Sequence, residues 1–299
     1  MSVDEERIDR TFSVGATPEL SITNVTGSTD VRVWDARAIR IVASKRPGGT
    51  IPFAPVAEGF QATKISMEQQ GDTITVKTNT DYQGVWSFLR WLGGVALVDY
   101  LAYVPADCSV VVSQATGSLS VQGLLGSMVA RTVSASITAR DLAGSVALST
   151  VSGRIECESV RGKLAVKGVS GRVRVERSHL LSFSGKTVAG NIDLTLVPTP
   201  GATYELETVS GDARVVIPPG LGVSARLDST SGSIVSGSSG RSLIVHAAPR
   251  SFSSSCAGSN ARRPSLRIVA ISGNDMQPLQ PAAIAASCGR VSRNQPNSK

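Results

Sequence analysis

One short phrase returns seven times between Ala115 and Gly240. It reads Val-Ser-Gly-Arg-Ile from Val151, Val-Ser-Gly-Arg-Val from Val169 and Val-Ser-Gly-Asp-Ala from Val209. Its small residue recurs at steps of 18 to 21 residues, at Gly117, Ala135, Gly153, Gly171, Gly190, Gly211 and Gly232. A fixed period of this length is typical of stacked repeats, in which no unit can bury its apolar face alone.

Each repeat contains two turns and two alternating segments. Gly126, Gly144 and Gly162 lie midway between the main small residues, so a turn is expected about every half repeat. Between turns, apolar and polar residues alternate, as in Ile155 to Glu158, which is the pattern of a half-buried strand. The sequence therefore predicts an all-β chain. Its centre is a β-solenoid, a parallel β-helix or β-roll stack of 18–21-residue coils with two short strands per coil.

Three columns of the repeat are expected to face the core. The column two places before the small residue contains Ala115, Val133, Val151, Val169, Val188, Val209 and Thr230. The column two places after it contains Leu119, Ile137, Ile155, Val173, Ile192, Ala213 and Ile234. The column four places after it contains Val121, Ala139, Cys157, Val175, Leu194 and Val215. Stacking these columns would form one continuous core.

The pattern changes along the chain. The expected parts are a frayed N-terminus at 1–10, an irregular β-rich region at 11–112 with an apolar insertion at 85–98, regular solenoid repeats at 113–240, degenerate final coils at 241–276 and a disordered tail at 277–299. The insertion is too short and too interrupted to cross a membrane as a helix. We interpret it either as a cap over the solenoid or as a docking segment for a membrane surface or partner.

Two groups of residues are candidates for a contact surface. The apolar insertion supplies Trp86, Phe88, Leu89, Trp91 and Leu92. The densest basic group supplies Arg154, Arg161, Lys163, Arg172 and Arg174. The net charge of the chain is only +7, so the basic group fits either a solvated outer face or a site for a polyanion or membrane surface. No aromatic residues are interleaved with it, and no nucleic-acid partner is expected.

The residues give little support for catalysis or metal binding. The turns lack the recurring Asp of calcium-binding repeats, and two histidines are too few for the three-histidine zinc sites of some solenoids. Asp193 and Asp212 lie one coil apart but in different columns, and no serine of the phrase has a histidine base nearby. We expect no enzyme, no cofactor and no metal; a carbohydrate-active β-helix is the remaining enzymatic alternative.

The cysteines and the first residues bear on the compartment. Cys108, Cys157, Cys256 and Cys288 show no metal-ligand spacing; Cys157 is expected in the core, and pairing of Cys256 with Cys288 stays open. The first ten residues lack the apolar core of a signal peptide. A cytoplasmic location is therefore expected, with association with the cell envelope left open.

The Val-Ser-Gly-x-Ile phrases resemble a known family when they are taken together with the Val104-Pro105 strand and the Phe-x-Val opening at Phe12. They are similar to the bacterial β-strand-repeat proteins labelled "putative adhesin". The resemblance covers roughly Thr11 to Gly240. It implies a non-catalytic β-solenoid, often attached to membrane or envelope systems, with no catalytic residues to transfer. A binding or adhesin-like module is the first interpretation, with an unknown protein, a polysaccharide or a membrane surface as partner. The alternative is a self-assembling scaffold of the bactofilin type, in which homo-oligomers form through the coil ends.

Overall fold

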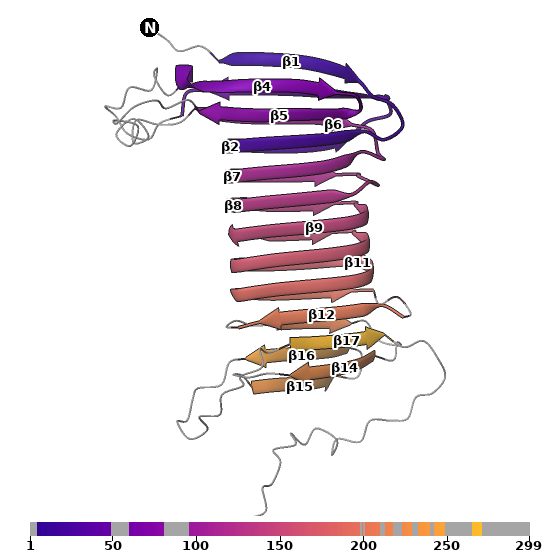
Figure 1. Cartoon of the computed structure of the whole chain (residues 1–299). Helices are drawn as coiled ribbons and strands as arrows, with labels where there is room; N and C mark the ends of the chain where they lie inside the picture. The colour runs from indigo at the N-terminus through magenta and orange to yellow at the C-terminus, as the bar shows by residue number, and fades with distance from the viewer. Residues whose placement is uncertain are drawn as a thin grey trace, which may run out of the picture.

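The computed structural model describes residues 5–48, 60–80, 96–197, 199, 201–209, 213–217, 223–228, 233–239, 242–248 and 265–270. These residues are almost entirely in strands, apart from one helical turn at 60–62, which confirms the expected all-β class. The strands lie across a long column, one above the other (Figure 1). Residues 85–95 of the expected apolar insertion at 85–98 lie outside the described residues, whereas 97 and 98 belong to a strand.

The column has two faces that meet at a corner inside each long strand. Face A begins with β4 (Thr63–Gln70), β5 (Thr73–Thr80) and the first halves of β2 (Glu19–Val33), β7 (Ser109–Gln122) and β8 (Met128–Arg140). It continues with β9 (Ala143–Ser152), two segments of β11 (Arg161–Leu196), β12 (Thr203–Thr208), β17 (Ser265–Ala270) and β14 (Val223–Asp228). Face B contains β1 (Glu6–Ser13), β3 (Ala38–Arg46), β6 (Leu97–Val104), the second halves of β2, β7 and β8, then β10 (Ile155–Glu158), parts of β11, β13 (Ala213–Ile217), β16 (Ser242–Ala248) and β15 (Ser233–Ser239).

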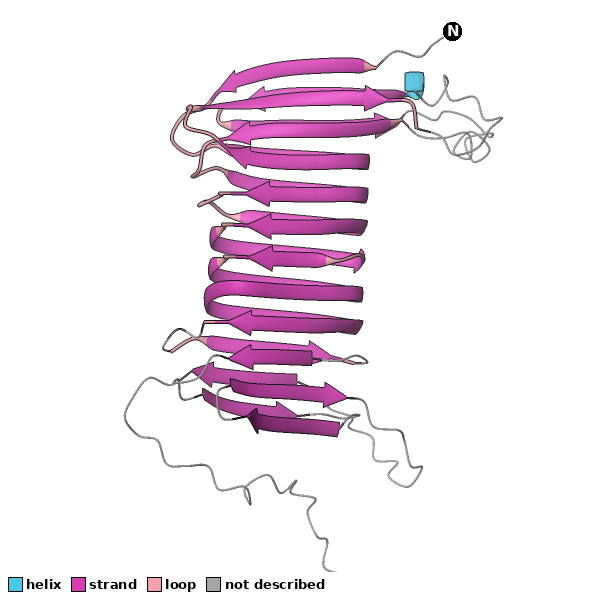
Figure 2. Cartoon of the chain, turned by 180° about the vertical axis from the view of Figure 1, so that it is seen from behind, coloured by secondary structure: helices cyan, strands magenta, loops and turns pink. Residues whose placement is uncertain are grey.

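The repeat sets the register of the parallel strands. Leu119 pairs with Ile137, Ile137 pairs with Ile155, and Ile155 pairs with Val173. The next step of this column is Ile192, which pairs with Ala213. Equivalent residues of successive repeats therefore lie directly above one another, and β11 runs continuously through two coils (Figure 2).

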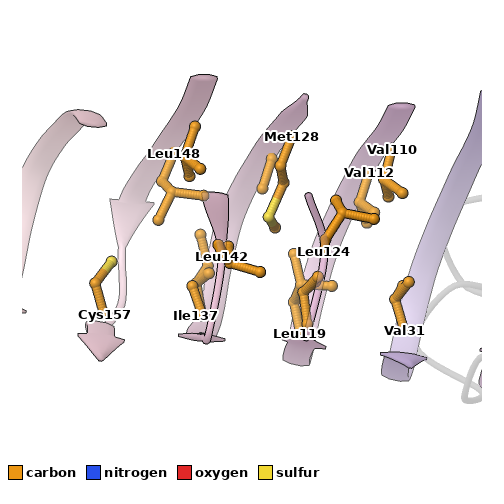
Figure 3. Packing of buried hydrophobic residues seen from close by; sticks show 14 of the residues in the cluster. Val31, Val110, Val112, Leu119, Leu124, Met128, Ile137, Leu142, Leu148 and Cys157 are labelled. Atoms are coloured by element: carbon orange, nitrogen blue, oxygen red, sulfur yellow. The ribbon is translucent and has the colours of Figure 1, made fainter. Parts of the chain in front are cut away.

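The core is a thin double layer between the faces. Among the residues whose side chains the structure describes, the columns two and four places after the small residue are buried as expected, with Leu119, Ile137, Cys157 and Val175 no more than 2% exposed. Residues of face A, such as Met128 and Leu148, point inward from the opposite side. Figure 3 shows the two layers in contact between the strands. Short branched side chains fill a gap this thin, which accounts for the low aromatic content of 4%.

The column two places before the small residue does not face the core, so that part of the prediction is wrong. Its valines are 46% to 52% exposed, and they are Val133, Val151, Val169, Val188 and Val209. At the corner, two consecutive side chains point outward, as Val133 and Ser134 do, and the buried residue before them is Thr132. The strict alternation of a strand therefore breaks where the chain turns from face A to face B.

A buried polar column supports this corner from inside. It consists of Asn24, Gln114, Thr132, Thr150, Thr187 and Thr208, and the half-buried Gly168 takes the position next to Thr150. The Gln114 amide donates to the carbonyl oxygen of Gly27 at 2.9 Å, and the Thr187 hydroxyl donates to the carbonyl oxygen of Gly190 at 3.1 Å. Such bonds satisfy backbone groups that the turn leaves unpaired.

Replacing Gly168 with threonine is expected to stabilise the protein. Gly168 pairs with Thr150, whose buried hydroxyl has no partner within the described residues. A Cβ atom at Gly168 would lie 3.6 Å from the nearest heavy atom, in Thr187, which is ordinary contact. The new hydroxyl can bond Thr150 as Thr187 bonds Thr208, at 3.1 Å. We expect the free energy of unfolding to rise by about 1 kcal/mol.

Urea unfolding followed by circular dichroism measures this change, with Gly168→Ala as the matched control. Alanine reduces the entropy of the unfolded chain but adds no hydroxyl, so it should give about half the gain. A Gly168→Thr variant no more stable than Gly168→Ala would show that the buried column contributes no hydrogen bond at this level.

The two ends of the stack depart from parallel coils. At the N-terminal end, β3 pairs antiparallel with β6 and with β1, and β4 pairs antiparallel with β5. At the other end, β15 and β13 pair antiparallel with β16, and β17 lies antiparallel between β12 and β14. The copy of the phrase at Thr230 predicts a further parallel coil, whereas β15, which follows it, pairs in the opposite direction.

Candidate functional site

The five basic candidates lie on different sides of the stack. Arg154 and Arg172 occupy the same outward column of face B in adjacent coils, and Arg174 points outward from the same face, opposite Glu156. Lys163 points outward from face A, opposite Ser145 of the preceding coil, and Arg161 lies at the far corner, beside Leu142. The structure therefore brings three of the five together on face B and separates the other two from them. Trp86, Phe88, Leu89, Trp91 and Leu92 lie outside the described residues.

Face B carries a mixed network of charges in its middle coils. Arg174 bonds Glu176 at 2.6 Å, Arg140 lies 3.4 Å from Glu158, and Arg177 also pairs with Glu158. Thr138, Arg140, Glu156, Cys157, Glu158, Arg174 and Glu176 line a shallow depression there. Arg154 and Arg172 reach Glu156 and Asp193 at 3.4 and 4.0 Å. These exposed pairs are each worth about 0.2–1 kcal/mol, and those of Glu158 and Asp193 join neighbouring coils.

The described cysteines are not activated nucleophiles. Cys108 and Cys157 are free and buried. Burial raises the pKa of each thiol to about 12, so the reactive thiolate is scarce near neutral pH. Within the described residues, no cluster of three or more His, Cys, Asp or Glu side chains has the arrangement of a metal site. The described part of the chain also contains no helix of the length and apolarity that a membrane crossing requires.

Face A differs from face B in its outward charges. In the coils from Ser109 to Lys186, its outward residues are Ser109, Val111, Ser113, Ser127, Val129, Arg131, Ser145, Ala147, Ser149, Lys163, Ala165, Lys167, Ser182, Ser184 and Lys186. All four charged members of this set are basic. Lys186 bonds Glu207 of the next coil at 3.0 Å. Arg131, Lys163 and Lys167 make no ion pair with any described residue.

The exposed valines form a second feature that the sequence interpretation missed. We name Val133, Val151, Val169, Val188 and Val209 the valine edge. It follows the corner up the stack, and each member lies between the outward columns of face A and face B. A signal was present in the sequence: threonine recurs directly before these valines, at Thr132, Thr150, Thr187 and Thr208. These threonines take the inward position at the corner, and the valine that follows each of them points outward.

Part of this chain is similar to a known family, and two solved structures are also similar to it. Residues 108–219 match the family described as Toastrack DUF4097. A solved structure of a "putative cell adhesion protein" from Clostridium sporogenes ATCC 15579 is similar with 7% identity and a TM-score of 0.34, over 64% of this chain and 82% of that chain. Another, a "Putative lipid binding protein" from Parabacteroides distasonis ATCC 8503, is similar with 11% identity and a TM-score of 0.25, over 71% and 92%. A search of curated proteins finds no match. Over residues 108–219 this chain is similar to the Toastrack DUF4097 domain, a bacterial domain of unknown function, which confirms the expected resemblance.

Proposed function

We propose that this chain is a β-solenoid binding module, non-catalytic and adhesin-like, that contacts a partner at a membrane or cell envelope with the sides of its stack. The observation that supports this proposal best is the N-terminal end of the stack. There, antiparallel strands follow the parallel coils and leave no coil edge for a second stack to continue. The sides of the column are then the surfaces that remain for recognition.

The last strand on face B is strongly charged. Four of the eight residues of β1 are charged, and they are Glu6, Arg7, Asp9 and Arg10. Asp9 accepts from Arg40 at 2.6 and 3.0 Å, and this guanidinium lowers the pKa of Asp9 below its usual value. Lys45, only 7% exposed, bonds Glu6 at 2.7 Å and lies over the Phe60 ring. Charged residues along an edge strand oppose pairing with another chain.

The alternative is a scaffold of the bactofilin type that grows end to end. Such growth needs open coil edges at both ends with parallel strands in matching register. The antiparallel strands at both ends of this stack are unsuited to that role. The two functions differ in assembly, so assembly is the property to measure.

We expect the intact chain to stay monomeric in light scattering over a wide range of concentrations and to form no filaments in electron micrographs. A variant that lacks residues 1–13 is the matched comparison. It should self-associate, because the β3 edge that β1 covers becomes free to pair. Filaments of the intact chain would instead support the scaffold, and a monomeric truncated variant would show that β1 does not protect the end.

A further inference from the structure

The valine edge is a line of five exposed apolar side chains at one corner of the stack. Its five members are in adjacent coils, and neighbouring strands lie about 4.8 Å apart, so the line is roughly 20 Å long. Each valine is 46% to 52% exposed, although before four of the five the corner buries a threonine. Isolated surface valines need no explanation, but a continuous column marks an interaction surface.

Only the side chains of this edge are available to a partner. Thr150 pairs with Gly168 and Ser152 pairs with Ser170, on either side of the corner. The Gly153 amide donates to the Ser170 carbonyl oxygen at 3.4 Å. The backbone is therefore bonded along the stack, and a strand of a partner protein cannot add here. The edge suits a partner that accepts apolar side chains without ordered hydrogen bonds.

Basic side chains flank the valine edge on both faces. In the coils of the five valines, the nearest outward column of face A contains Arg131, Ser149, Lys167, Lys186 and Glu207. The nearest outward column of face B contains Ser118, Ser136, Arg154, Arg172 and Asn191. In the coils of Val133, Val151, Val169 and Val188 neither column contains a carboxylate. In the coil of Val209, Glu207 bonds Lys186 at 3.0 Å, and the matching position of face B is Asp212, which lies outside the described residues. Glu156 and Asp193, which pair with Arg154 and Arg172, lie one column further from the edge.

We propose that the stack lies with its valine edge on the surface of an anionic lipid bilayer. This inference rests on the proposed binding function and names its partner. The valines enter the boundary between headgroups and acyl chains, and the flanking Arg and Lys side chains extend to lipid phosphates on both sides. A second copy of the chain fits less well, because two such edges would bring like charges together.

Vesicle flotation tests this surface. The intact chain should float with vesicles of mixed phosphatidylcholine and phosphatidylglycerol, and much less with phosphatidylcholine alone. Replacing Val151, Val169 and Val188 together with threonine keeps the side-chain shape and should weaken binding about tenfold. Arg131→Gln and Lys167→Gln should each weaken it about fivefold. Added salt should weaken binding of the intact chain more than binding of the variant that combines Arg131→Gln with Lys167→Gln.

The matched controls lie away from the edge. Leu125→Thr removes an apolar side chain that is 60% exposed in the turn between β7 and β8, at the opposite corner. Lys163→Gln removes a charge of face A that pairs with no described residue and lies four residues before Lys167 on the same strand. Both should bind as the intact chain does.

Three outcomes would overturn the inference. In the first, the intact chain is monomeric and binds neither kind of vesicle. In the second, the triple threonine variant binds vesicles as well as the intact chain does. In the third, a Trp86→Ser, Trp91→Ser variant loses vesicle binding while the triple threonine variant keeps it. A dimer that the triple threonine variant abolishes would assign the edge to a second copy. Each of these results is separate from failure of the proposed function, which would appear as filaments without lipid.

Discussion

Replacing Val173 with aspartate is expected to unfold several coils together. Val173 is 2% exposed and lies in the column between Ile155 and Ile192. A carboxylate there would lose its hydration and find no partner in the apolar layer, which costs on the order of 4 kcal/mol. Since each coil is stabilised by its neighbours, the loss should spread to β10 and β11 rather than stay at one residue.

The matched substitution is Val169→Asp, four residues earlier in the same strand. Val169 is 46% exposed, so its carboxylate stays hydrated, and Lys167 and Arg172 are nearby in sequence. We expect a change in the free energy of unfolding within about 0.5 kcal/mol. Thermal unfolding followed by circular dichroism compares the two variants. Equal and large losses from both would mean that the valine edge is buried in solution.

The sequence repeat predicts the middle of this fold well, because the turns and strands that it encodes lie within single coils. A small residue every 18 residues with apolar residues two and four places later sets both the coil length and the register. The structure places Ile137, Ile155 and Val173 directly above one another, as that spacing requires. One slipped residue would turn the whole column outward, so few alternative registers compete.

The two corners of each coil could not be predicted from the alternation of apolar and polar residues alone. At the far corner, Gly123, Asp141, Ser159 and Arg177 all have φ between 48° and 81°. The half-period glycines Gly144 and Gly162 follow three residues later with φ of 97° and 103°. Three residues other than glycine thus adopt the left-handed conformation that the sequence pattern reserves for glycine, since stacking on Gly123 imposes the same turn.

The ends and the contact surface were the least predictable parts. Pairing of β1 with β3 or of β17 with β12 joins segments far apart in sequence, and no repeat encodes such pairs. The basic group from Arg154 to Arg174 is compact in sequence, yet a coil sends successive segments to opposite faces. Closeness along the chain therefore does not make a patch in this fold, whereas equal position in successive coils does.

A second large loss of stability is expected for Gly117→Val, at a position that is equivalent in successive coils. Gly117 has φ of +114°, and a Cβ atom there would lie 1.8 Å from the carbonyl oxygen of Gly27 in the preceding layer. The clash is with backbone, so no side chain can move to relieve it, and β7 must separate from β2. We expect a loss of about 4 kcal/mol in the free energy of unfolding.

Ala135 provides the control, because it occupies the same column one coil later and already carries a Cβ atom without a left-handed φ. Ala135→Gly should cost only about 1 kcal/mol, from the added freedom of the unfolded chain. Hydrogen exchange should locate the damage of Gly117→Val in β2 and β7, while β9 and β11 stay protected because they contact neither glycine. Uniform loss of protection along the whole stack would show that the coils unfold as one unit. If the Gly117→Val variant were as stable as the Ala135→Gly variant, the corner would tolerate a side chain at this position.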